Sequence, residues 1–143
     1  MRVLGLDIGS KRVGIAISDE LGFTAQGLDT LMWKNADALL DRIASLVDQY
    51  GVSVIVVGMP YNMNGSEGPQ ALKIRGLMQL IGDRIAIPVK EWDERLSTVA
   101  ADRALLEADL SRSKRKKLVD KIAAVLILQG YLDRQSFKDR LDV

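Results

Sequence analysis

Two short apolar runs open the chain. Residues 3–8 and 13–17 are apolar and are separated by a Gly-Ser-Lys-Arg connection. Short apolar runs bounded by turn residues are typical of buried strands, so this segment predicts a β-hairpin. Residues 23–31 predict a third, less regular strand, with Gly22 and Gly27 as turn or bulge positions.

A helical spacing of apolar residues follows this strand pattern. Apolar side chains recur at i, i+3, i+4 and i+7 at Ala36, Leu39, Leu40, Ile43, Leu46, Val47 and Tyr50. Asn35 is suited to the N-cap of this helix, and Gly51 to the position just after its last turn. A second helix is predicted over residues 69–81, ended by Gly82, with Ala71, Ile74, Leu77, Met78 and Ile81 on its apolar face.

Two more strands lie between and after these helices. Residues 52–58 form a continuous, mostly β-branched run, which is typical of a central parallel strand covered on both faces. A loop rich in glycine and proline follows, and open α/β sheets place ligands at such positions, beyond the carboxyl ends of their strands. Residues 85–92 predict a fifth strand that leads directly into Asp93 and Glu94.

The order of elements predicts the fold class. Sequential strands joined by short turns should be antiparallel, and the two strands reached through helices should run parallel to the first. We therefore expect an α/β fold with a mixed five-stranded sheet of order 3-2-1-4-5, strand 2 antiparallel, and helices on both faces. This order places the first strand, and with it Asp7, at the centre of the sheet.

The C-terminal third is predicted to be helical and partly basic. Ser97 or Thr98 is expected to cap a third helix over residues 99–108. The basic run 112–117 precedes a long apolar helix that ends near Leu132, and the residues after Arg134 are polar. We expect a single domain over residues 1–134 and a loose polar tail over residues 135–143.

Composition limits the possible chemistry. The 143 residues are 48% hydrophobic and 27% charged, with a net charge of +1, no cysteine and no histidine. A thiol nucleophile, a Ser-His-Asp triad and a histidine-ligated zinc are thereby excluded. An enzyme of this composition would work through carboxylates, hydroxyls, Lys and Arg, and the metal that suits those ligands is Mg²⁺ or Mn²⁺.

The same sequence carries no apolar run of membrane-spanning length. Because a strand with an acid at position 7 is predicted almost at once, we expect that its first residues are not a signal peptide. We expect a cytoplasmic protein with no membrane partner.

Asp7 is the first candidate for chemistry. It interrupts a buried strand, and a carboxylate near a core is costly without compensation. One interpretation is a strand-end acid that accepts hydrogen bonds from the turn amides of Ser10 and Lys11; the other is a metal ligand. Asp93 and Glu94 follow the fifth strand, and alternation points only one of them into the same site.

Asp120 is the most informative acid. It shares a helical stripe with Ala123, Ala124, Ile127 and Tyr131, and an acid on the core-facing stripe of an apolar helix is unusual. The two alanines would let the helix approach the sheet closely. The alternative is a buried aspartate bonded to a backbone amide or paired with a lysine.

Three carboxylates at the centre of a sheet would repel one another unless divalent cations lay between them. Such a cluster suits phosphodiester hydrolysis, in which Mg²⁺ lowers the pKa of a bound water and stabilises the leaving oxygen. The five cations within residues 112–117 oppose the helix macrodipole, and a phosphate backbone would neutralise them. The alternative for this run is a solvated charged segment.

Four motifs together resemble the YqgF/RuvX family of bacterial proteins, in the ribonuclease H-like superfamily. They are Leu-Asp7-Ile-Gly-Ser-Lys-Arg-Val-Gly, Val-Val-Gly58-Met-Pro-Tyr-Asn-Met-Asn-Gly65, Asp93-Glu94-Arg95-Leu-Ser-Thr98 and Val-Asp120-Lys-Ile-Ala-Ala. Members are described as Holliday junction resolvases and as pre-16S rRNA maturation nucleases. The resemblance implies a ribonuclease H-like fold and a Mg²⁺ or Mn²⁺ site formed by Asp7, Glu94 and Asp120.

The resemblance also implies contacts with the substrate backbone. The candidate substrate-binding residues are Ser10, Lys11, Asn62, Gly65, Arg95, Ser97, Thr98, Arg112, Lys114, Arg115 and Lys116. The implied partners are pre-rRNA or branched DNA and ribosomal particles, with the protein acting as a monomer or a homodimer.

Three functions compete at this point. The first is a metal-dependent nuclease that acts on pre-16S rRNA or, alternatively, on Holliday junctions. The second is an ATP-binding module, because Asp-Ile-Gly-Ser-Lys resembles the first phosphate loop of actin-like ATPases; these need two such domains. The third is a non-catalytic RNA-binding assembly factor, which would have no use for clustered negative charge.

Overall fold

A mixed sheet of five strands organises the molecule. The computed structural model describes residues 1–96 and 112–141, with only the backbone described for residues 112–117. The strand order is β3-β2-β1-β4-β5. The strands are β1 (Arg2–Ile8), β2 (Arg12–Ser18), β3 (Ala25–Met32), β4 (Val52–Met59) and β5 (Val89–Asp93). β2 is antiparallel to β1 and β3, and β4 runs parallel to β1 and β5. The predicted topology is confirmed.

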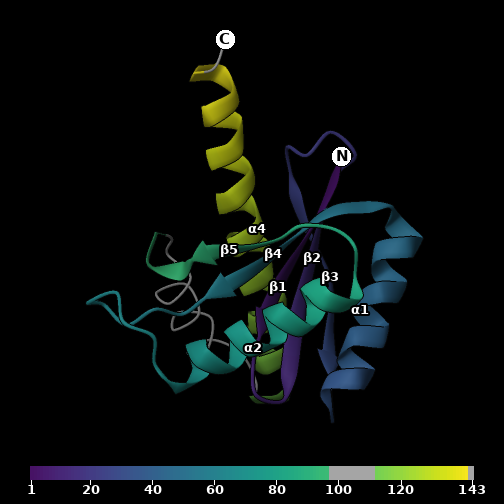
Figure 1. Ribbon diagram of the computed structural model, residues 1–143, viewed down its shortest axis with the longest axis vertical. Helices are drawn as coiled ribbons and strands as arrows, with labels where there is room; N and C mark the ends of the chain where they lie inside the picture. The colour runs from purple at the N-terminus through teal and green to yellow at the C-terminus, as the bar shows by residue number, and fades with distance from the viewer. Residues whose placement is uncertain (97–111, 142–143) are drawn as a thin grey trace.

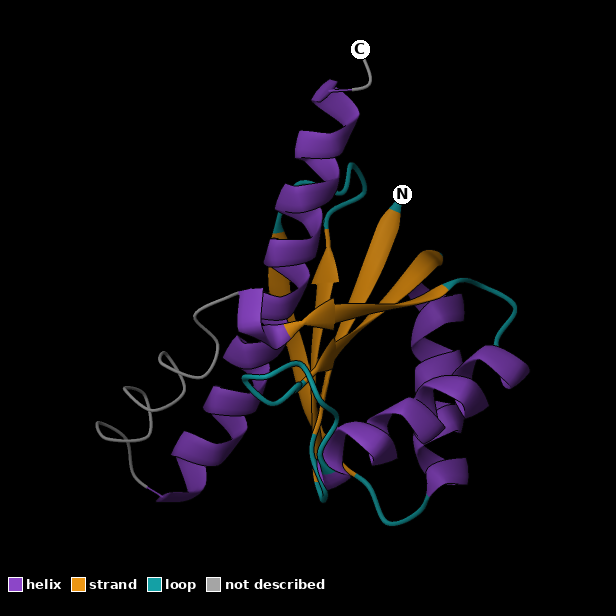
Figure 2. Ribbon diagram, turned by 60° about the vertical axis from the view of Figure 1, so that its left-hand side comes forward, coloured by secondary structure: helices purple, strands orange, loops and turns teal. Residues whose placement is uncertain are grey.

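Helices cover both faces of this sheet. The helices are α1 (Ala36–Tyr50), α2 (Pro69–Arg84), the short 3-10 helix η1 (Glu94–Leu96) and α4 (Arg112–Leu141). α1 and α2 lie on one face and α4 on the other, as the view along the sheet shows (Figure 2). The C-terminal end of α4 projects beyond the sheet (Figure 1).

The alternating side chains of each strand divide the core into two layers. Leu4, Leu6 and Ile8 pack with α1 and α2, whereas Val3 packs with α4. The layer under α4 is the smaller one, and it includes Ala123, Ala124, Ile127 and Leu128. Small residues at this interface bring the helix backbone close to the strands, so groups on α4 can reach the centre of the sheet.

Helix α1 begins and ends where its sequence predicts. The Oδ1 atom of Asn35 accepts a hydrogen bond of 2.8 Å from the backbone N–H of Ala38. Gly51 has a φ of 63°, and its N–H donates to the carbonyl of Val47. The helix therefore has the two caps that its sequence signals.

Two predicted boundaries are wrong by several residues. α2 continues through Gly82 to Arg84, whose side chain pairs with Asp41 on α1, and β5 begins at Val89 instead of residue 85. Nothing lies within 4 Å of a Cβ at Gly82, so this exposed glycine does not interrupt the helix. The N–H of Ile85 still donates to the carbonyl of Ile81, so this apolar residue caps the helix and does not start the strand.

The expected loose tail after Arg134 is corrected for residues 135–141, which continue α4 as helix. Gln135 and Ser136 are half-buried, and they line a cavity together with Leu21 and Phe23 of the β2–β3 turn. The helix therefore extends through a polar turn in which two side chains are half-buried, an extension that the composition of the turn alone does not predict.

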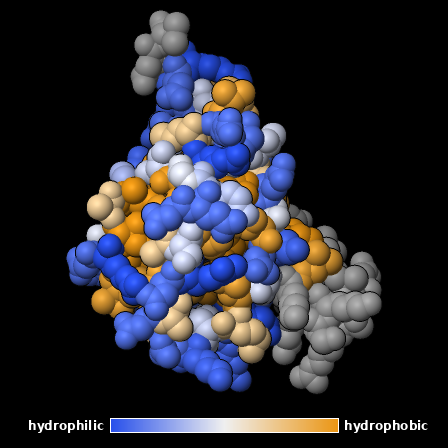
Figure 3. All heavy atoms as spheres, turned by 90° about the vertical axis from the view of Figure 1, so that its right-hand side faces the viewer, coloured by the Kyte–Doolittle hydropathy of each residue, from blue (hydrophilic) through white to orange (hydrophobic). Residues whose placement is uncertain are grey.

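No helix in the described ranges is long and apolar enough to cross a membrane. Hydrophilic residues separate small hydrophobic areas on the side of the molecule that carries α1 (Figure 3). The predicted helix over residues 99–108 and its cap at Ser97 or Thr98 lie outside the described residues.

Candidate functional site

The candidate site lies on the α4 side of the sheet, at the carboxyl end of β1. Asp7 alternates with Leu6 and Ile8, which pack with α1 and α2, so its half-buried side chain faces α4. Gly14 pairs directly with Asp7 on β2. On β4, Gly58 lies level with Asp7, because it follows the paired residues Leu6 and Val57.

These two glycines determine how closely other groups approach Asp7. A Cβ atom at Gly14 would lie 1.9 Å from the backbone oxygen of Asp120, so α4 rests directly on the strand backbone there. A Cβ at Gly58 would lie 3.4 Å from the carboxyl carbon of Glu94. Glycine at position 14 leaves room for the backbone of α4 at Asp120. Glycine at position 58 leaves room for the side chain of Ile127, whose Cδ1 would lie 2.4 Å from an added Cβ, while Glu94 lies beside Gly58 at an ordinary contact distance.

The structure separates Glu94 from its neighbour Asp93. Glu94 starts η1, and its carboxyl group lies beside Gly58 on the α4 side. Asp93 binds Arg95: its Oδ2 lies 2.7 Å from Nη2 of Arg95, and its Oδ1 accepts from the backbone N–H of Arg95 at 2.9 Å. These hydrogen bonds lower the pKa of Asp93 below its usual value of 3.8, with the Arg95 side chain as the main cause. Because Glu94 lies on the α4 side of the sheet, the side that Asp7 also faces, Glu94 is favoured over Asp93 as the site residue.

Asp120 is engaged by an arginine. The Nε atom of Arg12 lies 2.7 Å from Oδ2 of Asp120, and the two side chains are 27% and 20% exposed. The core-facing position predicted for Asp120 is confirmed. The alternative, an aspartate paired with a lysine, is also partly correct, because Asp120 forms an ion pair but its partner is Arg12. Among the described residues, no group of three acidic side chains that could hold a metal ion occurs.

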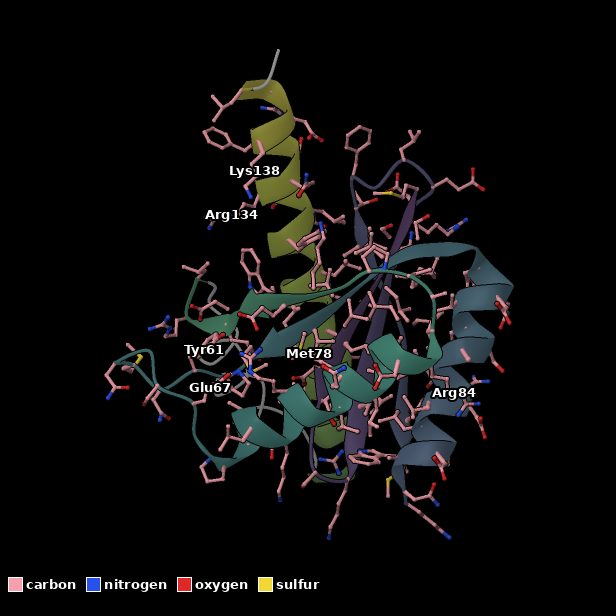
Figure 4. The ribbon with its side chains drawn as sticks, in the orientation of Figure 1. Tyr61, Glu67, Met78, Arg84, Arg134 and Lys138 are labelled. Carbon is pink, nitrogen blue, oxygen red and sulfur yellow. The ribbon has the colours of Figure 1, made fainter. Side chains whose placement is uncertain are left out.

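The loop after β4 is held by a polar network (Figure 4). The hydroxyl of Tyr61 donates to Oε1 of Glu91 at 2.5 Å and accepts from Nη2 of Arg75 at 3.0 Å. The hydrogen bond to Glu91 raises the pKa of Tyr61 above its usual value. Arg75 also pairs with Glu67. The guanidinium of Arg95 lies 5.3 Å from the centre of the Tyr61 ring, within the range of a cation–π contact.

Two predicted substrate-binding residues shape this same loop. The side chain of Asn62 donates to Ser66 Oγ at 2.9 Å, and Gly65 has a φ of 87°. The Nη1 atom of Arg95 lies 3.4 Å from the carbonyl of Met63, so Arg95 links this loop to η1. The structure therefore brings Asn62, Gly65 and Arg95 together.

The β1–β2 turn carries two other candidates, Ser10 and Lys11, both exposed. Trp33 fastens this turn: its indole N–H donates to the carbonyl of Gly9 at 3.1 Å, and its backbone N–H donates to the carbonyl of Lys11 at 3.1 Å. A conformationally fixed turn at the end of β1 is suited to presenting two side chains beside Asp7.

Sequence reasoning missed Arg12 and the two glycines. Glycine inside a buried strand often marks a close backbone approach, and this signal was present at Gly14 and Gly58. Ser97 and Thr98 lie outside the described residues. The candidates Arg112, Lys114, Arg115 and Lys116 lie in the first turns of α4, where only the backbone is described.

The sheet order, the helix across its central strand and the acids at the end of that strand define a ribonuclease H-like α/β protein. Two solved structures share this fold. RuvC of Thermus thermophilus matches with a TM-score of 0.58 and 13% identity, over 95% of this chain and 97% of that one. The fowlpox virus Holliday junction resolvase matches with a TM-score of 0.55 and 18% identity, over 94% of this chain and 99% of that one. The chain belongs to the RuvX family, whose model, described as "Holliday junction resolvase", matches residues 1–134.

Curated relatives are much more similar in sequence. A protein of Clostridium kluyveri is 57% identical over 136 residues, which cover 95% of this chain and 99% of the relative. A protein of Clostridium botulinum strain Hall is 59% identical with the same coverage. Both carry the name "Putative pre-16S rRNA nuclease".

Proposed function

We propose that this protein is a metal-dependent endonuclease that cleaves phosphodiester bonds in structured RNA and processes the 5′ end of pre-16S rRNA in the cytoplasm. The observation that carries this proposal is the placement of Asp7, Glu94 and Asp120. Asp7 lies at the end of β1, Glu94 lies beside Gly58 on the same side of the sheet, and Asp120 lies on α4 over Gly14, although their carboxylates do not already form a metal-binding group within the described residues. Relatives at 57–59% identity carry the corresponding name over nearly their whole length.

The donor set suits a hard divalent cation. Asp7, Glu94 and Asp120 would supply carboxylate oxygens to Mg²⁺ or Mn²⁺, and a chain without histidine or cysteine offers no softer ligands. The positions beside Asp7 support this fit, because the backbone of Asp120 approaches Gly14 and the Glu94 carboxyl lies beside Gly58, and these two glycines lie level with Asp7 on the neighbouring strands. When bound, such an ion supplies a water of lowered pKa and stabilisation of the leaving oxygen.

Arg12 has a defined place in this proposal. Its guanidinium neutralises Asp120 at a distance of 2.7 Å, which offsets the cost of holding this acid close to Asp7. A cation bound at the site would compete for the same carboxylate. We propose that Asp120 would be a ligand of the ion in exchange for its contact with Arg12, and that the Arg12 guanidinium would then be available to bind a phosphate of the substrate.

The remaining candidates position the substrate. Ser10 and Lys11 on the fixed turn and Asn62 and Gly65 on the β4–α2 loop would contact phosphates on either side of the acids. Because the charge of Arg95 is neutralised by Asp93, Arg95 would orient the substrate backbone more than it would attract it. The basic run 112–117 would bind the backbone next to Asp120.

Cleavage of four-way DNA junctions is the second candidate function. The description of the family model favours it. The structural neighbours add only the fold, since they are 13–18% identical to this chain. RNA is preferred because the relatives named for pre-16S rRNA share more than half of their residues with this chain.

The test uses a 16S rRNA precursor transcript with its 5′ extension, and a four-way DNA junction, each with Mg²⁺ and with EDTA. We expect Mg²⁺-dependent cleavage of the RNA and its loss in Asp7→Asn, while Asp48→Asn, an exposed acid on α1, keeps the wild-type rate. Cleavage that persists in purified, folded Asp7→Asn would remove Asp7 from the reaction. Faster cleavage of the junction than of the RNA would make DNA the substrate, and binding without cleavage would leave an assembly factor.

A further inference from the structure

A groove of about 310 Å³ lies between β5 and the projecting end of α4. Trp92 on β5 and Tyr131 on α4 belong to its lining, and Trp92 is only 7% exposed. A Cβ at Gly130 would lie 2.8 Å from the Trp92 ring, so the helix packs tightly at this end of the groove. Closely packed walls hold the groove in one shape.

Three cations converge on this groove from two elements. Lys90 alternates with Glu91 and lies on the same face of β5 as Trp92. Arg134 and Lys138 are one helical turn apart, and both extend from the side of α4 on which β5 lies (Figure 4). All three are exposed, and none of the ion pairs formed within the described ranges includes them.

The acids that border the groove are already neutralised elsewhere. Glu91 accepts from the hydroxyl of Tyr61 and pairs with Arg75 at 3.0 Å, both on the other side of β5. Asp93 is held by Arg95. The groove therefore has an excess of positive charge, although the chain as a whole is close to neutral. Locally concentrated positive charge attracts polyanions independently of net charge.

We propose that this groove binds the phosphate backbone of the RNA strand that runs away from the candidate site. The inference rests on the proposed function for the identity of the ligand. A phosphate backbone fits because Lys90, Arg134 and Lys138 line the groove on both sides and can each contact a separate phosphate. The projecting turns of α4, which continue beyond the family match that ends at residue 134, thereby have a role in substrate binding.

The distance from the groove to the acids sets the length of RNA required. Lys90 on β5 and Glu94, which directly follows this strand, are four residues apart, or at most about 13 Å at 3.3 Å per residue. Asp120 and Arg134 are fourteen residues apart on one helix, or about 21 Å at 1.5 Å per residue. At about 3.4 Å per phosphate along one strand, this separation corresponds to roughly four to six nucleotides.

The test compares two double variants that remove the same charge. Arg134→Gln/Lys138→Gln alters the groove, and Lys73→Gln/Arg140→Gln removes two cations from α2 and from the other side of α4. Binding of a fluorescein-labelled 24-base-pair RNA duplex is measured in EDTA over a series of salt concentrations. Each lost phosphate contact should lower the slope of log affinity against log salt by about 0.9, so the groove variant should lose about 1.8.

Because of this difference in slope, the ratio of the wild-type affinity to the affinity of the groove variant should fall about tenfold when salt is raised from 50 to 200 mM. The control variant should keep the wild-type slope. Equal slopes in the two double variants would overturn the proposal, and so would a wild-type slope in the groove variant. Because no cleavage occurs in EDTA, these outcomes are independent of whether Asp7→Asn abolishes cleavage.

Discussion

Replacing Gly14 by alanine should displace α4 and disturb the candidate site without altering any acid. The added Cβ would lie 1.9 Å from the backbone oxygen of Asp120 and 2.5 Å from its carbonyl carbon. Real Cβ atoms keep at least 3.0 Å from such atoms, so the helix must withdraw by about 1.1 Å. Backbone atoms of a long helix cannot move aside as the end of a flexible side chain can.

The expected cost follows from this displacement. Overpacking of a core costs about 1–3 kcal/mol, and a clash with helix backbone belongs at the upper end, so we expect a loss of about 3 kcal/mol in the free energy of unfolding. A misplacement of about 1 Å at a reacting centre can reduce the rate about 10²-fold. We therefore expect folded Gly14→Ala to cleave the RNA about a hundred times more slowly than wild type.

Urea unfolding and the Mg²⁺-dependent cleavage rate measure the two effects. Gly76→Ala is the matched control: this residue lies inside α2, and nothing lies within 4 Å of an added Cβ. Alanine in a helix interior is favoured over glycine by about 0.5–1 kcal/mol, so the control should be slightly more stable and fully active. A Gly14→Ala protein with wild-type stability and rate would show that α4 does not depend on this contact.

Three other predictions concern the acids. Glu94→Gln should abolish cleavage whereas Asp93→Asn should keep most of it, and equal rates in the two variants would contradict the assignment by sheet face. Because Arg95 lowers the pKa of Asp93, their ion pair should persist at every pH above 3.8 and be lost only as the pH falls through the lowered value; an NMR titration of the Asp93 carboxyl carbon checks this. Arg12→Gln should bind Mn²⁺ more tightly in calorimetry, because nothing then competes for Asp120, and unchanged affinity would refute the proposed exchange.

Most of the fold could be predicted because it rests on local periodicity. The apolar spacing and the caps of α1 were sufficient to give both of its ends. Boundaries failed where the local signal is weak: an exposed glycine such as Gly82 can lie inside a helix at a modest cost, and α2 continues through it to Arg84. The turn that contains Gln135 is helical although its residues are polar; Gln135 and Ser136 are half-buried and line a cavity with the β2–β3 turn, an arrangement that no local signal records.

The candidate site was only partly visible in the sequence. Asp120 stood out because it interrupts an apolar stripe, and the structure places it as expected over the central strands. Its partner Arg12 could not be predicted, since 108 residues separate the two side chains. Periodicity placed Asp93 and Glu94 on opposite faces without saying which acid lies on the side of Asp7; the position of Gly58 beside Glu94 places Glu94 on that side.

Anomalous scattering from a crystal soaked in Mn²⁺ tests the central claim most directly. We expect one or more ions in contact with the carboxylates of Asp7 and Glu94, with Asp120 turned from Arg12 toward the ion. Mn²⁺ bound elsewhere, or an intact Arg12–Asp120 pair with no ion beside Asp7, would contradict this claim.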